Sequence, residues 1–165
     1  MTWTRAGLEA AGYVGFVTFS ELHMRHATTE PGIYVVLRES RDAPRFLGHN
    51  AAGKAHSFSK DVQALEQAWV SSAEVLYIGR AIWGKRREGP HRRLKHYRRT
   101  GAGTANNHSG GVWIFQLEDW ASLTLCWRAS DNRSDAHIEA LEHHLIADFV
   151  SRPEYGKWPF ANRRD

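Results

Sequence analysis

Residues 80–99 contain the densest positive charge of the chain. The segment holds nine Lys or Arg and one acid, Glu88, so it carries +8, whereas the whole chain carries +4. A local excess of this size favours binding to a polyanion such as nucleic acid. A solvated basic face is the alternative, although Trp83, Leu94 and Tyr97 interrupt the charged run and favour nucleic acid. The side chains expected to contact nucleic acid are Arg80, Lys85, Arg86, Arg87, Arg92, Lys95, His96, Arg98 and Arg99.

Arg93 is the residue of this segment best suited to hold a phosphate in a fixed orientation. Pro90 favours the start of a helix, in which Leu94 would face the core and Tyr97 would lie one turn after Arg93 on the same side. A planar guanidinium can bind a phosphate through two parallel hydrogen bonds. Arg92 is the competing candidate, and a phosphate contact without catalysis is the alternative for any arginine here.

Glu142 is the best candidate for a metal ligand. It lies four residues after Ile138 and four before Ile146, on or beside the apolar stripe of a helix predicted at about 134–149. A carboxylate in that place needs a partner, and a hard divalent ion that keeps most of its waters fits this need. We therefore expect one Mg²⁺ or Mn²⁺ ion. The alternative partner is an arginine of the basic helix, and Glu139 is the second candidate ligand.

Tyr34 and Tyr77 stand at matching points of two predicted strands, Gly32–Leu37 and Val75–Gly79. A free tyrosine has a pKa of about 10, so a tyrosine that accepts a proton at neutral pH needs a neighbouring cation or a metal-bound water. The basic segment supplies such cations. The alternative is a pair of core tyrosines whose hydroxyls are hydrogen-bonded.

The remaining pattern indicates an α+β domain, a small antiparallel or mixed sheet with helices packed on it. Two further strands are predicted, Val112–Leu117 and Leu123–Trp127, joined as an antiparallel hairpin. Helices are predicted around Val62–Trp69, from Pro90 onward, and at about 134–149. Residues 39–60 and 100–111 are predicted loops because turn-forming residues are frequent in both.

The order of these segments resembles the GIY-YIG nuclease family over residues 31–162. The tripeptides Gly32-Ile33-Tyr34 and Tyr77-Ile78-Gly79 are followed by the basic stretch Arg93-Leu94-Lys95-His96-Tyr97, by Glu142 in its helix, and by Pro159-Phe160-Ala161-Asn162. Each tripeptide alone is weak evidence, whereas the ordered set is much stronger. The resemblance implies a metal-dependent endonuclease that hydrolyses phosphodiester bonds of DNA.

The resemblance also implies a catalytic role for each matching residue. One of the two motif tyrosines is the general base and the other positions water and phosphate, and which is which stays open. The arginine stabilises the transition state, Tyr97 and His108 relay protons or contact the phosphate, and Asn162 orients Glu142 or the phosphate. The full catalytic set is Tyr34, Tyr77, Arg93, Tyr97, His108, Glu142 and Asn162.

Two alternatives to a DNA endonuclease stay open, a non-catalytic nucleic-acid-binding module of the same fold and a nuclease that acts on RNA or structured nucleic acid. The complete residue set favours an enzyme, because a decayed module would be expected to have lost at least one member. The chain departs from the family pattern in its insert at about 39–72 between the two tripeptides. An N-terminal extension, residues 1–30, precedes the core. We expect no separate DNA-binding domain after the core.

The composition favours a single domain of 165 residues with 42% hydrophobic residues. One cysteine, Cys126, excludes an internal disulfide framework and a cysteine-based zinc finger. The chain has no run of 18 apolar residues, and its first residues lack the apolar stretch of a signal peptide. We therefore expect a cytoplasmic protein that does not bind a membrane. Its expected partner is double-stranded DNA, and a monomer is the favoured oligomeric state.

Overall fold

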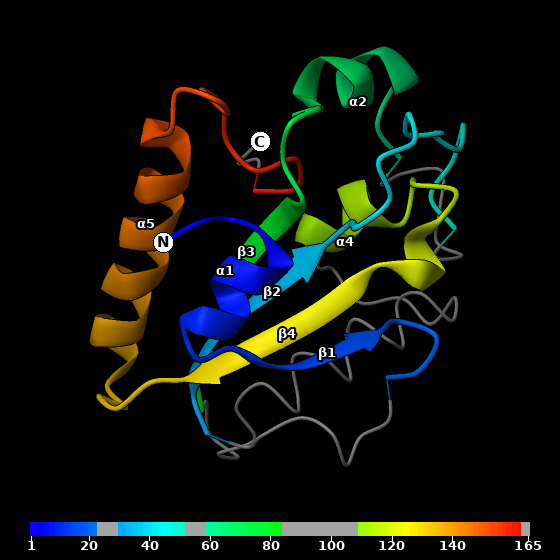
Figure 1. Cartoon of the computed structure of the whole chain (residues 1–165). Coiled ribbons are helices and arrows are strands. Elements are labelled where there is room, and N and C mark those ends of the chain that lie inside the picture. The colour runs from blue at the N-terminus through cyan, green and yellow to red at the C-terminus, as the bar shows by residue number, and fades with distance from the viewer. Residues whose placement is uncertain (23–29, 52–58, 84–108, 163–165) are drawn as a thin grey trace.

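The structure is a computed structural model that describes residues 1–22, 30–51, 59–83 and 109–162 (Figure 1). Its helices are α1 (Arg5–Ala10), α2 (Val62–Ala68), α4 (Ser109–Ile114), α5 (Asp135–Ser151) and the 3-10 helix η2 (Trp120–Ser122). Its strands are β1 (Val14–Thr18), β2 (Gly32–Leu37), β3 (Val75–Ala81) and β4 (Thr124–Ala129). Because one sheet carries helices on its faces, the fold is α+β, as the sequence predicts.

The sheet has the strand order β1-β4-β2-β3, and every neighbouring pair is antiparallel. Strand β2 lies inside the sheet and is buried along its whole length. Its bounds are those predicted from the β-branched run, because such residues pack well when both faces of a strand are covered. Strand β3 comes last in the order and pairs with β2 from Gly32 opposite Ala81 to Leu37 opposite Val75.

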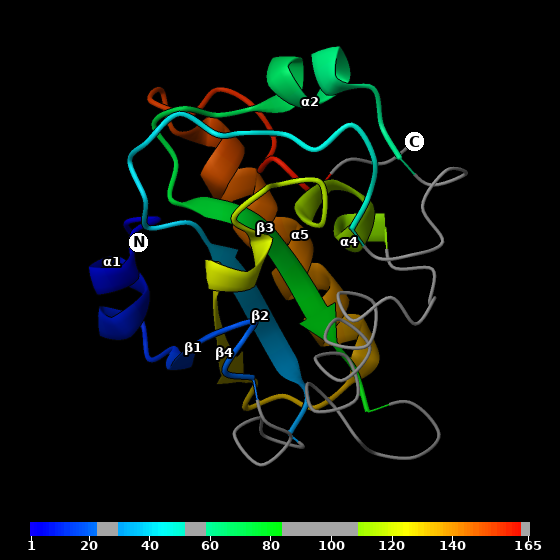
Figure 2. The ribbon, with the colours of Figure 1, turned by 90° about the vertical axis from the view of Figure 1, so that its right-hand side faces the viewer.

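Helices cover both faces of this sheet (Figures 1 and 2). One face packs against α5, where Ile33, Val35 and Ile78 share a core with Ile138 and Phe149. The other face packs against α2 and α4, in a core that contains both motif tyrosines together with Trp113, Phe115, Trp127 and Phe160. The side chains of β2 and β3 therefore divide between two separate environments.

Helix α5 begins where the sequence predicts. The hydroxyl of Ser134 accepts a hydrogen bond from the backbone N–H of His137 at 3.3 Å and caps the first turn. The predicted apolar stripe faces the sheet, with Ile138, Leu145 and Phe149 buried. Within the described ranges, the structure contains no helix with the length and apolar character of a membrane span.

The predicted strand Val112–Leu117 is wrong, and so is the hairpin it would form. Residues 109–114 are helix α4, and the chain continues as turns to Leu117, which makes a single bridge to Phe46. The predicted loop of residues 100–111 is likewise wrong at its last three positions, which begin α4. A short apolar run fits a buried helix as well as a buried strand, so periodicity could not separate the two.

The first 22 residues contribute a helix and a strand that the sequence did not predict. Strand β1 pairs with β4, and its register shifts between Val14 and Val17. Gly15 has a φ of 104° and Phe16 a φ of 36°, so this bulge interrupts the regular alternation of a strand. The strand is also mostly exposed or half-buried, which leaves a weak hydrophobic pattern.

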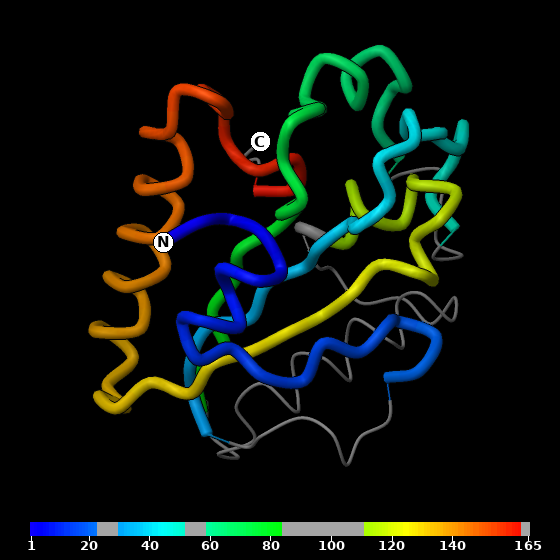
Figure 3. Tube along the Cα trace, viewed as in Figure 1, coloured from blue at the N-terminus to red at the C-terminus, as the bar shows by residue number. Residues whose placement is uncertain are grey.

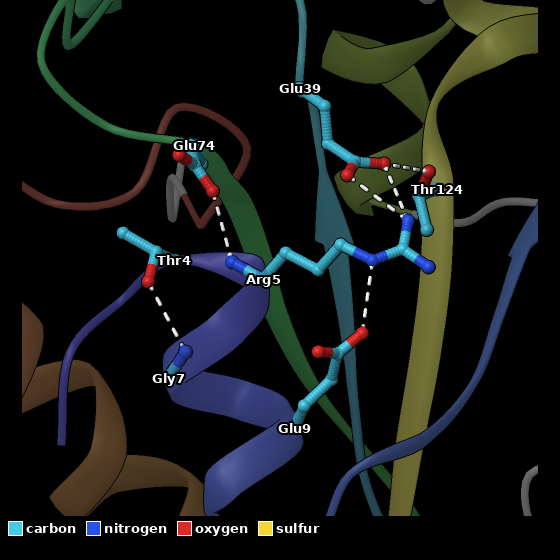
Figure 4. Close-up of polar contacts among 7 residues, drawn as sticks. All are labelled: Thr4, Arg5, Gly7, Glu9, Glu39, Glu74 and Thr124. Carbon is cyan, nitrogen blue, oxygen red and sulfur yellow. Dashed lines mark hydrogen bonds and ion pairs between the residues drawn. The ribbon is translucent and has the colours of Figure 1, made fainter.

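Helix α1 is fixed to the sheet by polar contacts of one arginine (Figure 4). The Arg5 guanidinium binds Glu9 on the same helix and Glu39 just after β2, each at 3.0 Å. The backbone N–H of Arg5 donates to Glu74, which precedes β3, and Glu39 also accepts from the hydroxyl of Thr124 in β4. Arg5 thus connects α1 directly with residues at the ends of β2 and β3, and through Glu39 with β4.

A buried glutamine in the turn after α4 binds the insert between the tripeptides. Gln116 donates to the carbonyl oxygens of Leu47 and Lys60 at 3.2 and 2.8 Å, and it accepts from the Lys60 backbone N–H at 2.6 Å. These bonds hold the chain just before α2. The helix predicted around Val62–Trp69 is confirmed at Val62–Ala68, where Leu65 packs in the same core as the tyrosines.

Candidate active site

The two motif tyrosines lie on one face of the sheet, as expected. Tyr34 is opposite Gly79 and Tyr77 is opposite Val36, so the tyrosines are diagonal neighbours on β2 and β3. Their ring centroids are 5.7 Å apart, and the ring planes are inclined at 41°. Tyr34 is fully buried and Tyr77 is 6% exposed. The pairing of the two strands therefore brings together two residues far apart in the sequence.

The space for this pair depends on Gly79. A Cβ at that position would lie 2.6 Å from Cζ and 2.7 Å from the hydroxyl oxygen of Tyr34, and 2.4 Å from Cε1 of Tyr77. Both rings thus lie over the bare backbone of Gly79. The first tripeptide has a similar requirement, because a Cβ at Gly32 would lie 2.1 Å from the carbonyl oxygen of Arg128. The glycine of each tripeptide is required by close approach of its neighbours.

Glu142 reaches from α5 to the residue that follows Gly79. Its Oε1 accepts from the backbone N–H of Arg80 at 3.0 Å, and its Oε2 accepts from Nη1 of the Arg80 guanidinium at 2.6 Å. The Glu142 side chain is 13% exposed. A carboxylate at this position was expected to need a partner, and that expectation is confirmed. The ion pair is made with Arg80 in β3, whereas the sequence assigned Arg80 to nucleic acid.

Arg80 also binds a second carboxylate of α5. Its Nη2 lies 2.9 Å from Oε1 of Glu139, whose side chain is half exposed. Glu139 and Glu142 are three residues apart, so both lie on the side of α5 that faces β3. Two carboxylates thus share one guanidinium, and the cluster as a whole carries one net negative charge.

Asn162 binds the backbone of β3 and not Glu142, which was one of the two partners expected for it. Its side-chain oxygen accepts from the backbone N–H of Ile78 at 2.8 Å, and its amide nitrogen donates to the Ile78 carbonyl at 2.6 Å. The backbone N–H of Ala161 donates to the carbonyl of Leu76 nearby. The segment before the C-terminus therefore runs along β3 (Figure 3). Asn162 completes the outer edge of the strand and makes no hydrogen bond with Glu142.

These contacts meet at Gly79 and Arg80. The tyrosine rings lie over Gly79 on the face covered by α2 and α4. Glu142 binds the next peptide N–H from the outer edge of β3, and the Arg80 side chain turns toward α5. Four matching positions of the resemblance, Tyr34, Tyr77, Glu142 and Asn162, are thus gathered around one short piece of β3.

The other predicted site residues lie outside the described residues. They include the candidate transition-state arginine Arg93, together with Tyr97 and His108. The remaining nucleic-acid-binding candidates outside these ranges are Lys85, Arg86, Arg87, Arg92, Lys95, His96, Arg98 and Arg99.

The donor chemistry at Glu142 fits one hard divalent ion. Each carboxylate oxygen offers two lone pairs, so the hydrogen bond from the Arg80 N–H leaves Oε1 able to accept a second partner. Across the described part of the chain, no three His, Cys, Asp or Glu side chains cluster closely enough to hold a metal by themselves. An ion here would therefore depend on one or two carboxylates and on water, which suits Mg²⁺.

The sequence analysis did not predict the contact between Arg80 and Glu139. The spacing of Glu139 and Glu142 predicts that both lie on one helix face, but it does not identify the strand residue that meets them. A basic residue directly after a strand tripeptide, opposite two acids of a core-facing helix, is the signal that could have been used.

Comparison of the chain with protein-family models, with curated proteins and with solved structures finds no match. The case for a function therefore depends on the residues themselves and on how the fold groups them.

Proposed function

We propose that the protein is a metal-dependent endonuclease that hydrolyses phosphodiester bonds of DNA. The observation that carries the proposal is the meeting of the two tripeptides: Tyr34 and Tyr77 pack 5.7 Å apart over Gly79, and Glu142 binds the adjacent N–H of Arg80. Core packing alone accounts for two adjacent tyrosines. The mostly buried Glu142 carboxylate meets the next peptide of the same strand, and its ion pair with Arg80 is the structural alternative to a catalytic role.

In this proposal each described residue has a chemical task. One tyrosine, ionised to its phenolate beside a neighbouring cation, accepts the proton of the attacking water and becomes neutral, while the hydroxyl of the other binds the water or a phosphoryl oxygen. Hydrolysis also needs positive charge beside the phosphoryl oxygens, and Arg93 and Arg80 are the candidates for it. The rigid pairing of β2 with β3 fixes the distance between the tyrosines, which favours orientation of a single phosphate.

Glu142 is the residue that would hold a divalent ion, either Mg²⁺ or Mn²⁺. Such an ion supplies positive charge that stabilises the oxygen atoms gaining charge during hydrolysis. The backbone N–H of Arg80 keeps the Glu142 carboxylate oriented from the side of the strand. Because the ligand set is small, we propose one ion.

The nucleic-acid partner is proposed from the charge of residues 80–99, which carry +8. Arg80 is the basic residue of this segment that lies in the described part of the chain, in β3. Phosphate contacts release counterions, so affinity for DNA should fall steeply as salt increases. Double-stranded DNA is the proposed substrate, with RNA and structured nucleic acid as further substrates to compare.

The proposal is tested by nicking of supercoiled plasmid in Mg²⁺ or in EDTA. We expect nicking only with the metal ion, and we expect Tyr34→Phe and Tyr77→Phe each to reduce it by roughly 100-fold or more, the usual contribution of a positioned acid or base. Tyr13→Phe is the matched control, because Tyr13 is also a buried tyrosine but belongs to the opposite core.

Four results would contradict the proposal. Nicking that persists in EDTA would exclude the metal-dependent mechanism. Equal nicking by the Tyr34, Tyr77 and Tyr13 variants would remove the tyrosines from the chemistry. DNA binding without any nicking, or cleavage of RNA alone, would favour the non-catalytic module or the RNA nuclease.

A further inference from the structure

We propose that Arg80 is an internal counter-ion that keeps divalent cations from Glu142 until a nucleic-acid phosphate draws the guanidinium away. This inference rests on the proposed function, since it assumes that Glu142 takes a cation and that Arg80 meets phosphate. The inference goes further in one respect: the cation and the nucleic acid should bind cooperatively. The cation binds the carboxylate of the Arg80–Glu142 ion pair, and the nucleic acid binds its guanidinium.

The contacts of Arg80 separate into two groups. The backbone N–H of Arg80 holds Oε1 of Glu142 at 3.0 Å, and it stays in place whatever the side chain does. The guanidinium holds Oε2 of Glu142 at 2.6 Å and Glu139 at 2.9 Å. The side chain can therefore leave while the carboxylate of Glu142 remains oriented by the strand.

Charge makes the guanidinium and a divalent cation competitors. Both would neutralise the same carboxylate, and two cations beside one carboxylate repel each other. With the guanidinium in place, Glu142 and Glu139 are already partly neutralised. When it leaves, two carboxylates on one side of α5 remain together, an arrangement that attracts a hard cation.

Exposure allows nucleic acid to act on this ion pair. The Arg80 side chain is 33% exposed, whereas that of Glu142 is 13% exposed. A phosphate arriving from solvent can thus reach the guanidinium, and arginine binds phosphate through two parallel hydrogen bonds. Because the phosphate removes the guanidinium that competes with the cation, phosphate binding should raise the affinity of Glu142 for the cation. By linkage, cation binding should raise the affinity for phosphate by the same factor.

The direct test is a Mn²⁺ titration of the whole chain without nucleic acid, followed by the electron paramagnetic resonance signal of free Mn²⁺. We expect weak binding by the wild type and binding tighter by roughly tenfold or more in Arg80→Gln, the size of effect that one neighbouring charge has on proton binding. The gain should vanish in Arg80→Gln with Glu142→Gln. Arg80→Lys keeps the positive charge and should bind as weakly as the wild type.

Arg5→Gln is the matched control, because Arg5 also joins two glutamates, Glu9 and Glu39, on another part of the molecule. The Glu9 and Glu39 side chains are 50% and 40% exposed, against 13% for Glu142, so solvent screens their charge and we expect little gain in Mn²⁺ affinity. Equal Mn²⁺ affinity of the wild type and Arg80→Gln would overturn the inference, and so would an equal gain in Arg5→Gln. A thermal melt of each variant confirms that it is folded before titration.

The same titration with a short DNA duplex separates this inference from the proposed function. We expect the duplex to tighten Mn²⁺ binding in the wild type and to have little effect in Arg80→Gln. If the Arg80→Gln gain appears but the plasmid is never nicked, the counter-ion role stands and the endonuclease proposal fails. If the plasmid is nicked but the duplex leaves the Mn²⁺ affinity of the wild type unchanged, the coupling is wrong and the endonuclease stands.

Discussion

At the scale of single residues, Gly79 decides whether the two tyrosines can meet. Any side chain at this position would occupy the space taken by the rings of Tyr34 and Tyr77, both of which are held by a packed core. Because interiors are close-packed, the rings have little room to move aside. The packing of the two tyrosine rings therefore requires a glycine at position 79.

Gly79→Ala should destabilise the protein by about 1–3 kcal/mol, the usual cost of adding an atom to a packed core. Denaturation in urea measures the change in the free energy of unfolding. Gly48→Ala is the control, because a Cβ there would meet nothing within 4 Å. Equal stability of the Gly79 variant and the wild type would contradict the packing described here.

For single residues, the sequence predicted the elements in which the site residues lie, but not all of their partners. The strand patterns located Tyr34 and Tyr77 in two strands, and the resemblance implied that the two residues act together. Their common face depends on the register between β2 and β3, which the pattern within each strand does not contain. The helix pattern predicted that Glu142 needs a partner. The identity of that partner, Arg80, depends on which strand residue meets α5 in three dimensions, and a linear pattern does not contain this information.

At the scale of elements, β3 is an outer strand whose exposed backbone groups are nevertheless bonded. The Asn162 side chain accepts a hydrogen bond from the N–H of Ile78 and donates one to its carbonyl. The Glu142 carboxylate accepts from the N–H of Arg80. Unpaired edges of this kind invite association with other chains. The segment before the C-terminus therefore protects the strand that carries the site.

Asn162→Ala should lower the free energy of unfolding by about 1–3 kcal/mol, because two hydrogen bonds to a partly buried backbone are lost. Urea denaturation measures it, with Gln67→Ala on the exposed side of α2 as the control. Loss of nicking without loss of stability would contradict this structural role and return Asn162 to the catalytic role implied by the resemblance.

Helix α1 connects the stability of the fold to pH through Glu39 (Figure 4). Burial raises the pKa of this carboxyl, but hydrogen bonds from Thr124 and Arg5 outweigh burial and hold the pKa below its ordinary value of 4.5. A carboxyl whose pKa is lowered by folding stabilises the native state above its unfolded pKa. That contribution is lost as the pH falls through the lower, folded value.

We therefore expect stability to decline on acidification below about pH 4.5, the ordinary pKa of this glutamate, with Glu39→Gln removing part of the decline. Thermal melts of both proteins between neutral and acidic pH measure this. Parallel pH profiles for the variant and the wild type would show that Glu39 is not a source of the dependence.

The elements also differ in how well the sequence predicted them. Strand β2 and helix α5 carry strong local signals, a β-branched run and a serine cap before an apolar stripe. Residues 112–117 carry only an apolar run, and the buried contacts of α4 make it helical. Strand β1 has a bulge at two residues with positive φ and little burial, so its pattern was too weak to detect.

At the scale of the whole molecule, the sheet separates two environments and β3 connects them. The tyrosines lie in the core covered by α2 and α4, while α5 brings Glu139 and Glu142 to the other side and to the edge. This division follows from the alternation of side chains along a strand. A small domain can thus gather residues from both motif strands, α5 and the C-terminal segment.

The central claim is that Glu142 serves chemistry and not DNA binding. Its most direct test is plasmid nicking in Mg²⁺ beside DNA affinity in EDTA, for Glu142→Gln and the wild type. Gln is preferred to Ala because its side-chain oxygen can still accept from the Arg80 N–H. We predict that nicking falls by several orders of magnitude while affinity stays within a few-fold, because only transition-state interactions are lost. Nicking by Glu142→Gln at the wild-type rate would contradict the account.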